Sequence, residues 1–534
     1  MCPTSTGSLY VFSMRACSTL VAFLAVGLSA AQSFALSSPS PIPGAAGNGL
    51  ADDTSAIQSA INQLPPGATL NFGDTTFTYL ISSTLVLAPG VNYTGTATIL
   101  MKSSANPGTP MMVLNYGRTD NTTITGLTLN ASGVGGGVLI SVNGLWYTPA
   151  RNVTIANVIF RNTRAHPTGA GDDAIYDPVG LQNSVIAGNS FFNCGGGINV
   201  ADAANLYITN NRFDTITQDD AIFLVFPANP FSYGNGITIS GNTGRNLSRM
   251  AIELWSPVPS PTVVAPVISN NVFSGWSSNT NADTGFGISV MAGIGALVQN
   301  NSLSGLPIGL GIELGVPNST VQYNNVSGFG LGLAMYNTHD SQIQNNTFYG
   351  QSTAAICFSS GPTGSHNNIM VSGNTISEPQ RMGIWINAPD WNGTSIIGNF
   401  ITRTGGLYPA DNYSSFLAIN PWPNPAVSVT NNYVAQIASN PPTGFSFTGI
   451  SINGSSGSNY GSHYDNNQIK SNSYFPAGVG IAVNEPGAAS GATFTQNLME
   501  NLVYASNGGS SAPLSTSTNR VVNCQVIGPL FQTF

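Results

Sequence analysis

The chain has 534 residues, of which only 13 are Lys or Arg and 21 are Asp or Glu, and its formal net charge is −8. Charged residues make up 6% of it, against roughly 25% in an ordinary globular domain. Hydrophobic residues make up 42% of the chain, which is enough to build a core. This composition disfavours charge-driven disorder. It also excludes a nucleic-acid partner, because phosphate binding needs clustered cations.

The N-terminal segment has the pattern of an export signal. Arg15 precedes an apolar run at 20–28, and Ser33-Phe34-Ala35 is the small-x-small pattern of a signal-peptidase site. The run is too short to span a membrane, and no later stretch of about 18 uncharged apolar residues appears. We therefore expect residues 1–35 to be a signal peptide and 36–50 a linker. The mature protein is expected to be secreted or periplasmic, without membrane contact.

Residues 51–115 carry the signals of an N-terminal cap and the first coils. A repeat array needs such a cap, because an open sheet edge recruits other chains. Asp52-Asp53-Thr54 offers groups that cap a helix N-terminus, and Pro65-Pro66-Gly67 ends the helix. Strands are predicted at Leu70–Phe72 and Tyr79–Leu87. The helix shows an amphipathic stripe made of Ile57, Ala60, Ile61 and Leu64.

Residues 116–510 repeat one pattern. An alternating strand ends in Asn or Asn-Asn, then come a short apolar stub, a variable loop, and a small residue followed by Ile; Tyr207–Phe213 leading to Ala221-Ile222 is one copy. Successive copies are roughly 20 to 35 residues apart, the range of solenoid proteins. Asn tolerates a left-handed backbone and can hydrogen-bond up a column. The pattern predicts a parallel β-helix, with 511–534 as a C-terminal coil or cap.

The run from Asn48 to Ile61, NGLADDTSAIQSAI, resembles the N-terminal signature of pectate-lyase-superfamily β-helix proteins. With the Asn-bearing coils, the resemblance covers nearly the whole mature chain. It implies an all-β fold, a right-handed parallel β-helix behind a short amphipathic capping helix. The superfamily includes pectate lyases, polygalacturonases, alginate lyases and epimerases, phage tailspikes and members with no known activity. The resemblance therefore implies a polysaccharide partner, bound by a monomer or a homotrimer.

The motif of a small residue followed by Ile recurs in each coil, and its Ile aligns the coils with one another. If each aligned residue points inward, strand alternation sends the next residue outward. The residues that directly follow the aligned ones then form one outward column, and a second outward column, farther along each strand, is expected to contain Asp177, Trp255 and Tyr336. Aromatic side chains stack on the apolar faces of sugar rings, so this face predicts substrate-binding residues Tyr176, Trp255, Glu313, Tyr336 and Trp385. The aligned residues are Ile175, Ile198, Ile222, Ile252, Ile288, Ile312, Leu333, Ile356, Ile384, Ile450 and Ile481.

Two acidic pairs, Asp172-Asp173 and Asp219-Asp220, each lie just before an aligned Ile. Three consecutive glycines, at 195–197, lie between the two pairs in the sequence. The glycines predict an open slot between the pairs. Two coil steps place the pairs about 9.6 Å apart, near the upper limit of the roughly 6.5–9.5 Å that separates the carboxyl groups of inverting glycosidases. Like charge within a pair raises one pKa, as a general acid requires. Asp at a strand start also often only caps a turn.

A closer resemblance concerns the acidic pairs. Asp219-Asp220-Ala221-Ile222 looks like the Asp-Asp pair of polygalacturonases, and Asp172-Asp173-Ala174-Ile175 looks like a second copy. The resemblance implies that Asp220 or Asp173 is the acid or the base. The sequence lacks the Gly-His-Gly and Arg-Ile-Lys motifs with which that family holds its substrate.

Three hypotheses follow for the function. The first is a polysaccharide-cleaving enzyme that needs no metal or cofactor, with catalytic Asp173 and Asp220, their partners Asp172 and Asp219, and Glu253 assisting. The second is a Ca²⁺-assisted uronate lyase or C5-epimerase in which Arg249 is the base. The third is a non-catalytic glycan-binding or surface protein. Three cysteines without metal-ligand spacing are expected to be unpaired thiols, Cys194, Cys357 and Cys524.

Overall fold

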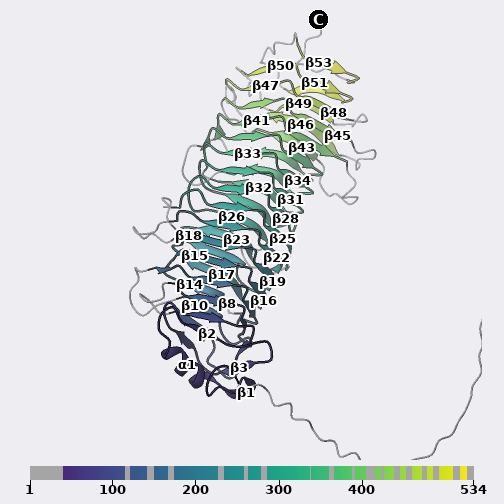
Figure 1. The fold of residues 1–534 in the computed structure, drawn as a ribbon. Coiled ribbons are helices and arrows are strands. Elements are labelled where there is room, and N and C mark those ends of the chain that lie inside the picture. The colour runs from purple at the N-terminus through teal and green to yellow at the C-terminus, as the bar shows by residue number, and fades with distance from the viewer. Residues whose placement is uncertain are drawn as a thin grey trace, which may run out of the picture. The chain divides into compact units, whose positions relative to one another are not determined.

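Short parallel strands make up almost all of the structure, a computed structural model. The strands of each sheet lie one above the next along a common axis (Figure 1). The structure describes residues 40–114, 121–140, 149–165, 173–226, 234–257, 263–277, 285–336, 338–359, 366–387, 391–404, 415–421, 426–437, 445–452, 460–471, 478–484, 492–508 and 518–525.

Within these residues the strands form three long sheets, which we name A, B and C, and one small pair, β36 (His366–Asn367) with β40 (Trp391–Asn392). Sheet A contains 18 strands: β1 (Asn48–Asp52), β3 (Thr78–Ile81), β6 (Thr98–Met101), β9 (Thr128–Asn130), β13 (Ile159–Arg161), β16 (Ser190–Cys194), β19 (Arg212–Ile216), β22 (Thr243–Leu247), β25 (Val272–Trp276), β28 (Ser302–Ser304), β31 (Asn325–Ser327), β34 (Thr347–Tyr349), β38 (Thr375–Ser377), β42 (Phe400–Arg403), β45 (Tyr433–Gln436), β48 (Gln468–Ser471), β51 (Leu498–Glu500) and β53 (Arg520–Val522).

Sheet B contains 17 strands: β2 (Thr69–Asn71), β5 (Asn92–Thr94), β8 (Thr123–Thr125), β11 (Ala150–Arg151), β12 (Thr154–Ala156), β15 (Leu181–Ala187), β18 (Ala204–Thr209), β21 (Thr238–Ser240), β24 (Val267–Ser269), β27 (Leu297–Gln299), β30 (Thr320–Gln322), β33 (Gln342–Gln344), β37 (Met370–Ser372), β41 (Ser395–Ile397), β44 (Ser428–Thr430), β47 (His463–Asp465) and β50 (Thr493–Thr495).

Sheet C contains 16 strands: β4 (Leu85–Leu87), β7 (Met112–Leu114), β10 (Val138–Ile140), β14 (Asp173–Asp177), β17 (Gly196–Ala201), β20 (Ile222–Val225), β23 (Met250–Trp255), β26 (Phe286–Val290), β29 (Leu310–Leu314), β32 (Leu331–Met335), β35 (Ala354–Phe358), β39 (Met382–Ile386), β43 (Ser415–Asn420), β46 (Ser446–Ile452), β49 (Gly478–Val483) and β52 (Tyr504–Gly508).

Each coil visits the three sheets in the order C, B, A, as in β14, β15 and β16, and the next coil begins again on sheet C with β17. Every pairing in these sheets is parallel and joins equivalent strands of neighbouring coils, for example β14 with β17 and β17 with β20. The predicted right-handed parallel β-helix is therefore confirmed. In the described part of the chain, no helix is long and apolar enough to cross a membrane.

The predicted capping helix is α1 (Thr54–Asn62), which buries Ile57 and Ile61. Of the expected capping groups, Asp52 Oδ1 accepts a hydrogen bond from the N–H of Thr54, the first helical residue, at 3.1 Å, whereas the expectation for Asp53 is wrong. The carboxylate of Asp53 does not cap the helix but accepts hydrogen bonds from the backbone N–H groups of Ala46 and Gly47, which precede β1. The strand expected at Tyr79–Leu87 is also two strands, β3 and β4, because the chain turns from sheet A to sheet C between them.

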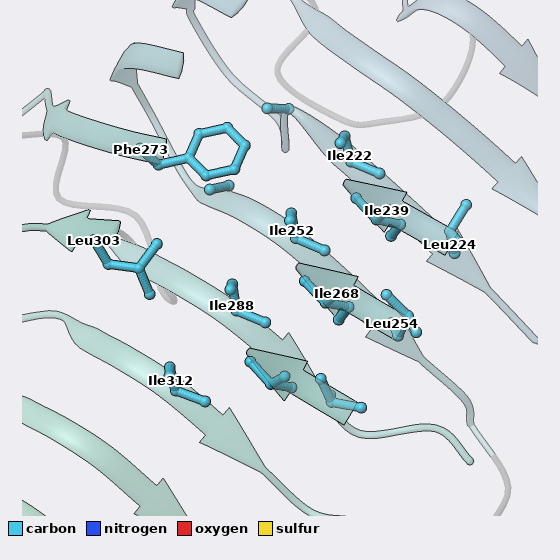
Figure 2. Packing of buried hydrophobic residues seen from close by; sticks show 14 of the residues in the cluster. Ile222, Leu224, Ile239, Ile252, Leu254, Ile268, Phe273, Ile288, Leu303 and Ile312 are labelled. Atoms are coloured by element: carbon cyan, nitrogen blue, oxygen red, sulfur yellow. The ribbon is translucent and has the colours of Figure 1, made fainter. Parts of the chain in front are cut away.

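The interior of the coils is a continuous stack of apolar side chains. Ile222, Ile252, Ile288 and Ile312 follow one another on sheet C, each paired in register with the next and fully buried (Figure 2). Burying such a side chain stabilises the fold by about 1.5–3 kcal/mol. The predicted alignment of coils is confirmed, and Ile419 joins the same column between Ile384 and Ile450.

The small residue before each aligned Ile has a steric cause. A Cβ on Gly197 would overlap the carbonyl oxygen of Ala221 in the next coil and lie 2.8 Å from the ring of Phe213. Gly287 and Gly332 meet the carbonyl oxygens of Gly311 and Ala355 in the same way. At these three coils neighbouring backbones therefore approach so closely that only Gly fits, whereas other coils leave room for a buried Ala, as at Ala221 and Ala355.

The Asn-Asn pairs occupy the tight corner between sheets B and A, and each Asn has its own role. In most pairs the first takes a left-handed backbone, with φ of 55° at Asn210 and at Asn300; in Asn324-Asn325 the preceding Tyr323 takes it, with φ of 56°, and Asn324 is the ladder residue. In the other pairs the second Asn is buried and continues a hydrogen-bonded ladder: the Asn301 amide donates to Asn324 Oδ1 at 2.9 Å and to the Ile268 carbonyl at 3.0 Å. The ladder runs through Asn189, Asn211, Asn242, Asn271, Asn301, Asn324, Asn346, Asn374, Asn399, Asn432, Asn467, Asn497 and Asn519.

Replacing Asn324 by Ala should destabilise the protein strongly. The change removes the acceptor of two bonds from Asn301 and both donated bonds of Asn324, leaving buried groups unpaired. Each such group costs about 1–3 kcal/mol, so we expect a loss of at least about 2 kcal/mol in the free energy of unfolding. The matched control is Asn325→Ala, since Asn325 is exposed on the outer face and should change stability by less than about 0.5 kcal/mol. Urea unfolding of both variants compares them, and equal losses would contradict the ladder's role.

The corner between sheets C and B holds a carboxyl group that the sequence analysis placed outside. Asp177 pairs in register with Val200, which faces inward, and Asp177 is only 1% exposed. The outward column in which the sequence analysis placed Asp177 lies one residue later along the strand. Its Oδ1 accepts hydrogen bonds from the N–H groups of Val179 and Gly180, while its Oδ2 has no partner. Burial raises the pKa of Asp177 to about 7, the two backbone hydrogen bonds act to lower it, and Asp202 adds to the rise.

The raised pKa of Asp177 predicts a pH-dependent stability. Below the ordinary Asp pKa of 3.8 the group is protonated in the folded and unfolded chains alike. As the pH rises from there to about 7, only the unfolded chain ionises, so the folded state loses up to about 4 kcal/mol. Asp177→Asn removes this contribution. Urea unfolding should therefore show the variant gaining stability relative to wild type between about pH 4 and pH 7, and a difference independent of pH would refute the assignment.

Candidate functional site

The outer face of sheet C carries the predicted column of residues that follow the aligned Ile. Register pairs Tyr176 with Asn199, and then Phe223 with Glu253, which is followed by Ser289. The column continues through Glu313, Ala334, Cys357 and Trp385. Polar and aromatic side chains of separate coils are thus held one coil apart, about 4.8 Å, on one surface. Figure 1 shows strands β14, β17 and β23, which carry three of these residues, one above another along the axis.

Three carboxyl groups converge on one arginine in this face. Arg249 Nη1 lies 2.5 Å from Asp220 Oδ2, 2.8 Å from Glu253 Oε2 and 3.7 Å from Asp219 Oδ1. The N–H of Met250 donates to Asp220 Oδ1 at 2.8 Å, and the N–H of Asp220 donates to Asp219 Oδ1 at 2.9 Å. Backbone and guanidinium donors therefore fix the carboxyl groups in place. We name Asp219, Asp220, Arg249 and Glu253 the carboxyl cluster.

The interior of the carboxyl cluster is closed to water, while its rim is open. The side chain of Asp220 has no exposed surface and that of Glu253 is 7% exposed, whereas those of Arg249 and Asp219 are 26% and 31% exposed. A ligand on sheet C therefore meets Asp219 and Arg249 first, and Glu253 next.

Charge and burial act on these groups in opposite directions. Burial raises the pKa of Asp220 well above its ordinary value; Arg249 opposes this, while Asp219 and Glu253, the latter also through a hydrogen bond, add to it. The pKa of Arg249 is raised, because the attraction of Asp220, Glu253 and Asp219 outweighs the lowering that burial causes. Asp220 thus keeps its proton at pH values where an ordinary Asp is ionised, and Arg249 stays a cation.

Asp173 lies on the same face, two coils before Asp220. Its Oδ2 accepts a hydrogen bond from the Asn199 amide at 3.0 Å, and the residue is 5% exposed. A Cβ on Gly196 would overlap Asp173 Oδ1 and lie 3.3 Å from Asp219 Cβ. The Asp173 carboxyl thus fills the space over Gly196 and reaches toward Asp219.

The expectation of an open slot at the three glycines is therefore wrong. A Cβ on Gly195 would overlap the carbonyl oxygen of Arg164, and a Cβ on Gly197 would overlap that of Ala221. The glycines allow close approach of neighbouring groups and leave no gap. Asp172, the partner of Asp173 in the sequence, lies outside the described residues.

The predicted binding residues extend the site along sheet C. Trp255, two residues after Glu253 on β23, is 40% exposed and offers an aromatic surface. Glu313 accepts a hydrogen bond from the Ser289 hydroxyl at 2.6 Å. The pKa of Tyr336 is raised mainly by burial and further by the nearby side chains of Glu313 and Cys357.

Tyr176 and Trp385 lie farther along the outer column and are half-buried. The pKa of the Tyr176 hydroxyl is raised by burial and by the carboxyl groups of Asp173 and Asp177. Trp385 pairs in register with Cys357. Tyr176 therefore adjoins the carboxyl groups, and Trp385 lies beyond Glu313.

Asn199 and Ser289 are site residues that the sequence analysis did not propose. Each follows an aligned Ile, which was the available signal, and each hydrogen-bonds a carboxyl group of the outer face. The cysteines Cys194, Cys357 and Cys524 are free thiols, the first two buried, with pKa values that burial raises to about 11. Among the described residues, no group of three or more His, Cys, Asp or Glu side chains is arranged to hold a metal ion.

The fold and its stacked outer face define a right-handed parallel β-helix protein. The family model described as a right handed beta helix region matches residues 231–401. No curated protein sequence matches the chain significantly.

Several solved structures are similar to the chain at low identity. An exopolygalacturonase of family 28 from Yersinia enterocolitica is 14% identical, with 76% of each chain covered and a TM-score of 0.40. The A-module of a mannuronan C-5 epimerase from Azotobacter vinelandii is 15% identical, with 91% of this chain and 97% of that one covered and a TM-score of 0.32. The Dettilon tailspike protein is 15% identical, with 84% and 68% covered and a TM-score of 0.36. These similarities concern the fold alone.

Replacing Gly196 by Ala should displace the Asp173 carboxyl, because the added Cβ overlaps Asp173 Oδ1. We expect the variant to lose about 1–3 kcal/mol of stability through overpacking and the lost Asn199 contact. Gly315→Ala is the matched control on sheet C, since there the nearest atoms belong to the flexible thioether of Met291. Thermal unfolding measures both, and Gly196→Ala behaving like the control would show that Asp173 does not occupy this space.

Proposed function

We propose that the chain is a secreted enzyme that hydrolyses glycosidic bonds of a polysaccharide, and that the carboxyl cluster with Asp173 is its active site. The observation that carries this proposal is the convergence of Asp219, Asp220 and Glu253 on Arg249 at the outer face of sheet C, where burial raises the pKa of Asp220 well above its ordinary value. Glycoside hydrolysis needs one carboxyl group that gives a proton and one that accepts a proton.

The proton source is the hydrogen-bonded pair of Asp220 and Glu253. Asp220 holds the proton because it is buried, yet its side chain does not reach the surface. Glu253 shares the hydrogen bond with Asp220 and retains some exposure, so it passes the proton to the leaving oxygen of the sugar. Arg249, fixed between the two, stabilises the negative charge that remains after the transfer.

Asp173 is the base that activates water. It lies two coils, about 9.6 Å along the axis, from Asp220, which holds the proton, and three coils from Glu253, which delivers it. Asn199 orients its carboxyl group, which reaches toward Asp219. Trp255, beside Glu253, supplies an aromatic face on which a sugar ring can stack.

Removing the acid or the base should abolish turnover without unfolding the protein. We expect Asp220→Asn and Asp173→Asn each to lower the rate of reducing-end release by about 10²–10⁴-fold, the usual contribution of a positioned acid or base. The assay uses a panel of neutral and acidic polysaccharides. Asp74→Asn, a change in an exposed turn on the cap, is the control and should keep full activity. Variants that keep wild-type rates would remove these residues from the mechanism.

The lyase alternative assigns the base to Arg249. An arginine in ion pairs with three carboxyl groups, with a raised pKa, is a poor proton acceptor. A lyase would also release unsaturated products that absorb ultraviolet light, in a reaction that a calcium chelator stops. Saturated products that form in the presence of the chelator separate the hydrolase from this alternative.

A second candidate is a glycan-binding protein without catalysis. It is favoured by the closed environment of Asp220, whose oxygens are already bound by Met250 N–H and Arg249. In that case Asp220→Asn and Asp173→Asn would keep the binding of a polysaccharide, and no member of the panel would release reducing ends.

A further inference from the structure

The outer face of sheet A carries a concentration of arginine in a chain that has only 13 Lys and Arg residues. Arg161 on β13, Phe192 on β16, Asp214 on β19 and Arg245 on β22 pair in register as one column, and Arg212 lies on β19 two residues before Asp214. We name these five residues the arginine patch. Strands β16, β19 and β22 follow one another in Figure 1, so the patch spans four successive coils.

Contacts within the arginine patch hold its guanidinium groups in place. The Cζ atoms of Arg161 and Arg212 lie 5.3 Å and 5.7 Å from the ring centroid of Phe192, as in cation–π contacts. Arg245 places Nε at 3.0 Å and Nη2 at 2.5 Å from Asp214 Oδ2, and Arg212 Nη2 is 3.5 Å from the same oxygen. The guanidinium groups are therefore pre-oriented on a rigid sheet.

The charges of the arginine patch do not balance. The patch contains three guanidinium groups and one carboxylate, which Arg212 and Arg245 contact, and this leaves two positive charges in excess on a protein whose net charge is −8. The side chains of Arg212 and Arg245 are 56% and 60% exposed, against 13% for Asp214. Like charges on neighbouring strands repel each other, and exposed ion pairs add little stability. The excess charge thus costs stability unless an anion binds.

The arginine patch also borders the carboxyl cluster along the chain. Asp219 follows the end of β19 by three residues, and Arg249 follows the end of β22 by two. Over these few residues the chain passes from sheet A to sheet C. A long ligand held on sheet A would therefore lie next to the site on sheet C.

We propose that the arginine patch binds an anionic polysaccharide through the carboxylate or sulfate groups that the polymer carries. Guanidinium groups donate paired, charge-assisted hydrogen bonds to such oxyanions. A polymer with repeated anionic groups can engage arginines of successive coils at once, which a single small anion cannot. The proposal does not depend on catalysis at the carboxyl cluster, since it concerns a different sheet.

The test compares polymers that share one backbone. Affinity electrophoresis and titration calorimetry measure the dissociation constants of wild-type protein for dextran sulfate, carboxymethyl-dextran and uncharged dextran at low and high salt. The variant is Arg212→Gln combined with Arg245→Gln. The matched control is Arg520→Gln. Arg520 on β53 is exposed and belongs to the outward column of sheet A that contains Arg212, but it lies outside the patch. Asp220→Asn separates this binding from the carboxyl cluster.

We expect wild type to bind at least one charged dextran and not the uncharged one, with affinity falling as salt rises. The double variant should bind at least about tenfold more weakly, with an unchanged melting temperature, while Arg520→Gln and Asp220→Asn bind like wild type. The charged dextran that binds more tightly identifies sulfate or carboxylate as the preferred group. Equal binding by the double variant, or an equal loss in Arg520→Gln, would overturn the proposal.

Discussion

The stacking of coils in exact register is the constraint on which the structure depends, and the buried asparagine ladder fixes it. A ladder amide within the stack bonds the coil before it and the coil after it, as Asn301 does with Ile268 and Asn324. A shift of one residue would break these bonds and turn the inward Ile column outward. The ladder therefore determines which side chains share a face, although it lies at a different corner from the candidate site.

The carboxyl cluster follows from this register. Asp220 and Arg249 come from successive coils, and they meet because the aligned Ile222 and Ile252 are paired. The same stacking buries Asp220 behind the rim formed by Arg249 and Asp219, which raises its pKa. Packing that stabilises the fold thus also prepares a carboxyl group that holds a proton, so the chemistry proposed for the outer face needs no separate scaffold.

Much of the fold was predictable from the sequence, and less of the site. The Asn pairs and the small-Ile motif are repeated many times, so their periodicity predicted the coils and the alignment of Ile175 with Ile198. The meeting of Arg249 with Glu253 depends on side-chain directions within one coil, which periodicity does not specify. The glycine triplet was misinterpreted because a missing side chain can leave a gap or admit a neighbour, and the carboxyl of Asp173 occupies that space.

The most direct test of the account is an infrared titration of the Asp220 carboxyl group. The difference spectrum between wild type and Asp220→Asn isolates the C=O stretch of that one protonated carboxyl. The account predicts that this band persists to a pH well above the ordinary Asp value of 3.8, because burial, Asp219 and Glu253 together outweigh Arg249. A band that disappears near 3.8, leaving only carboxylate absorption, would show that Asp220 is ionised, and the proposed proton source would be wrong.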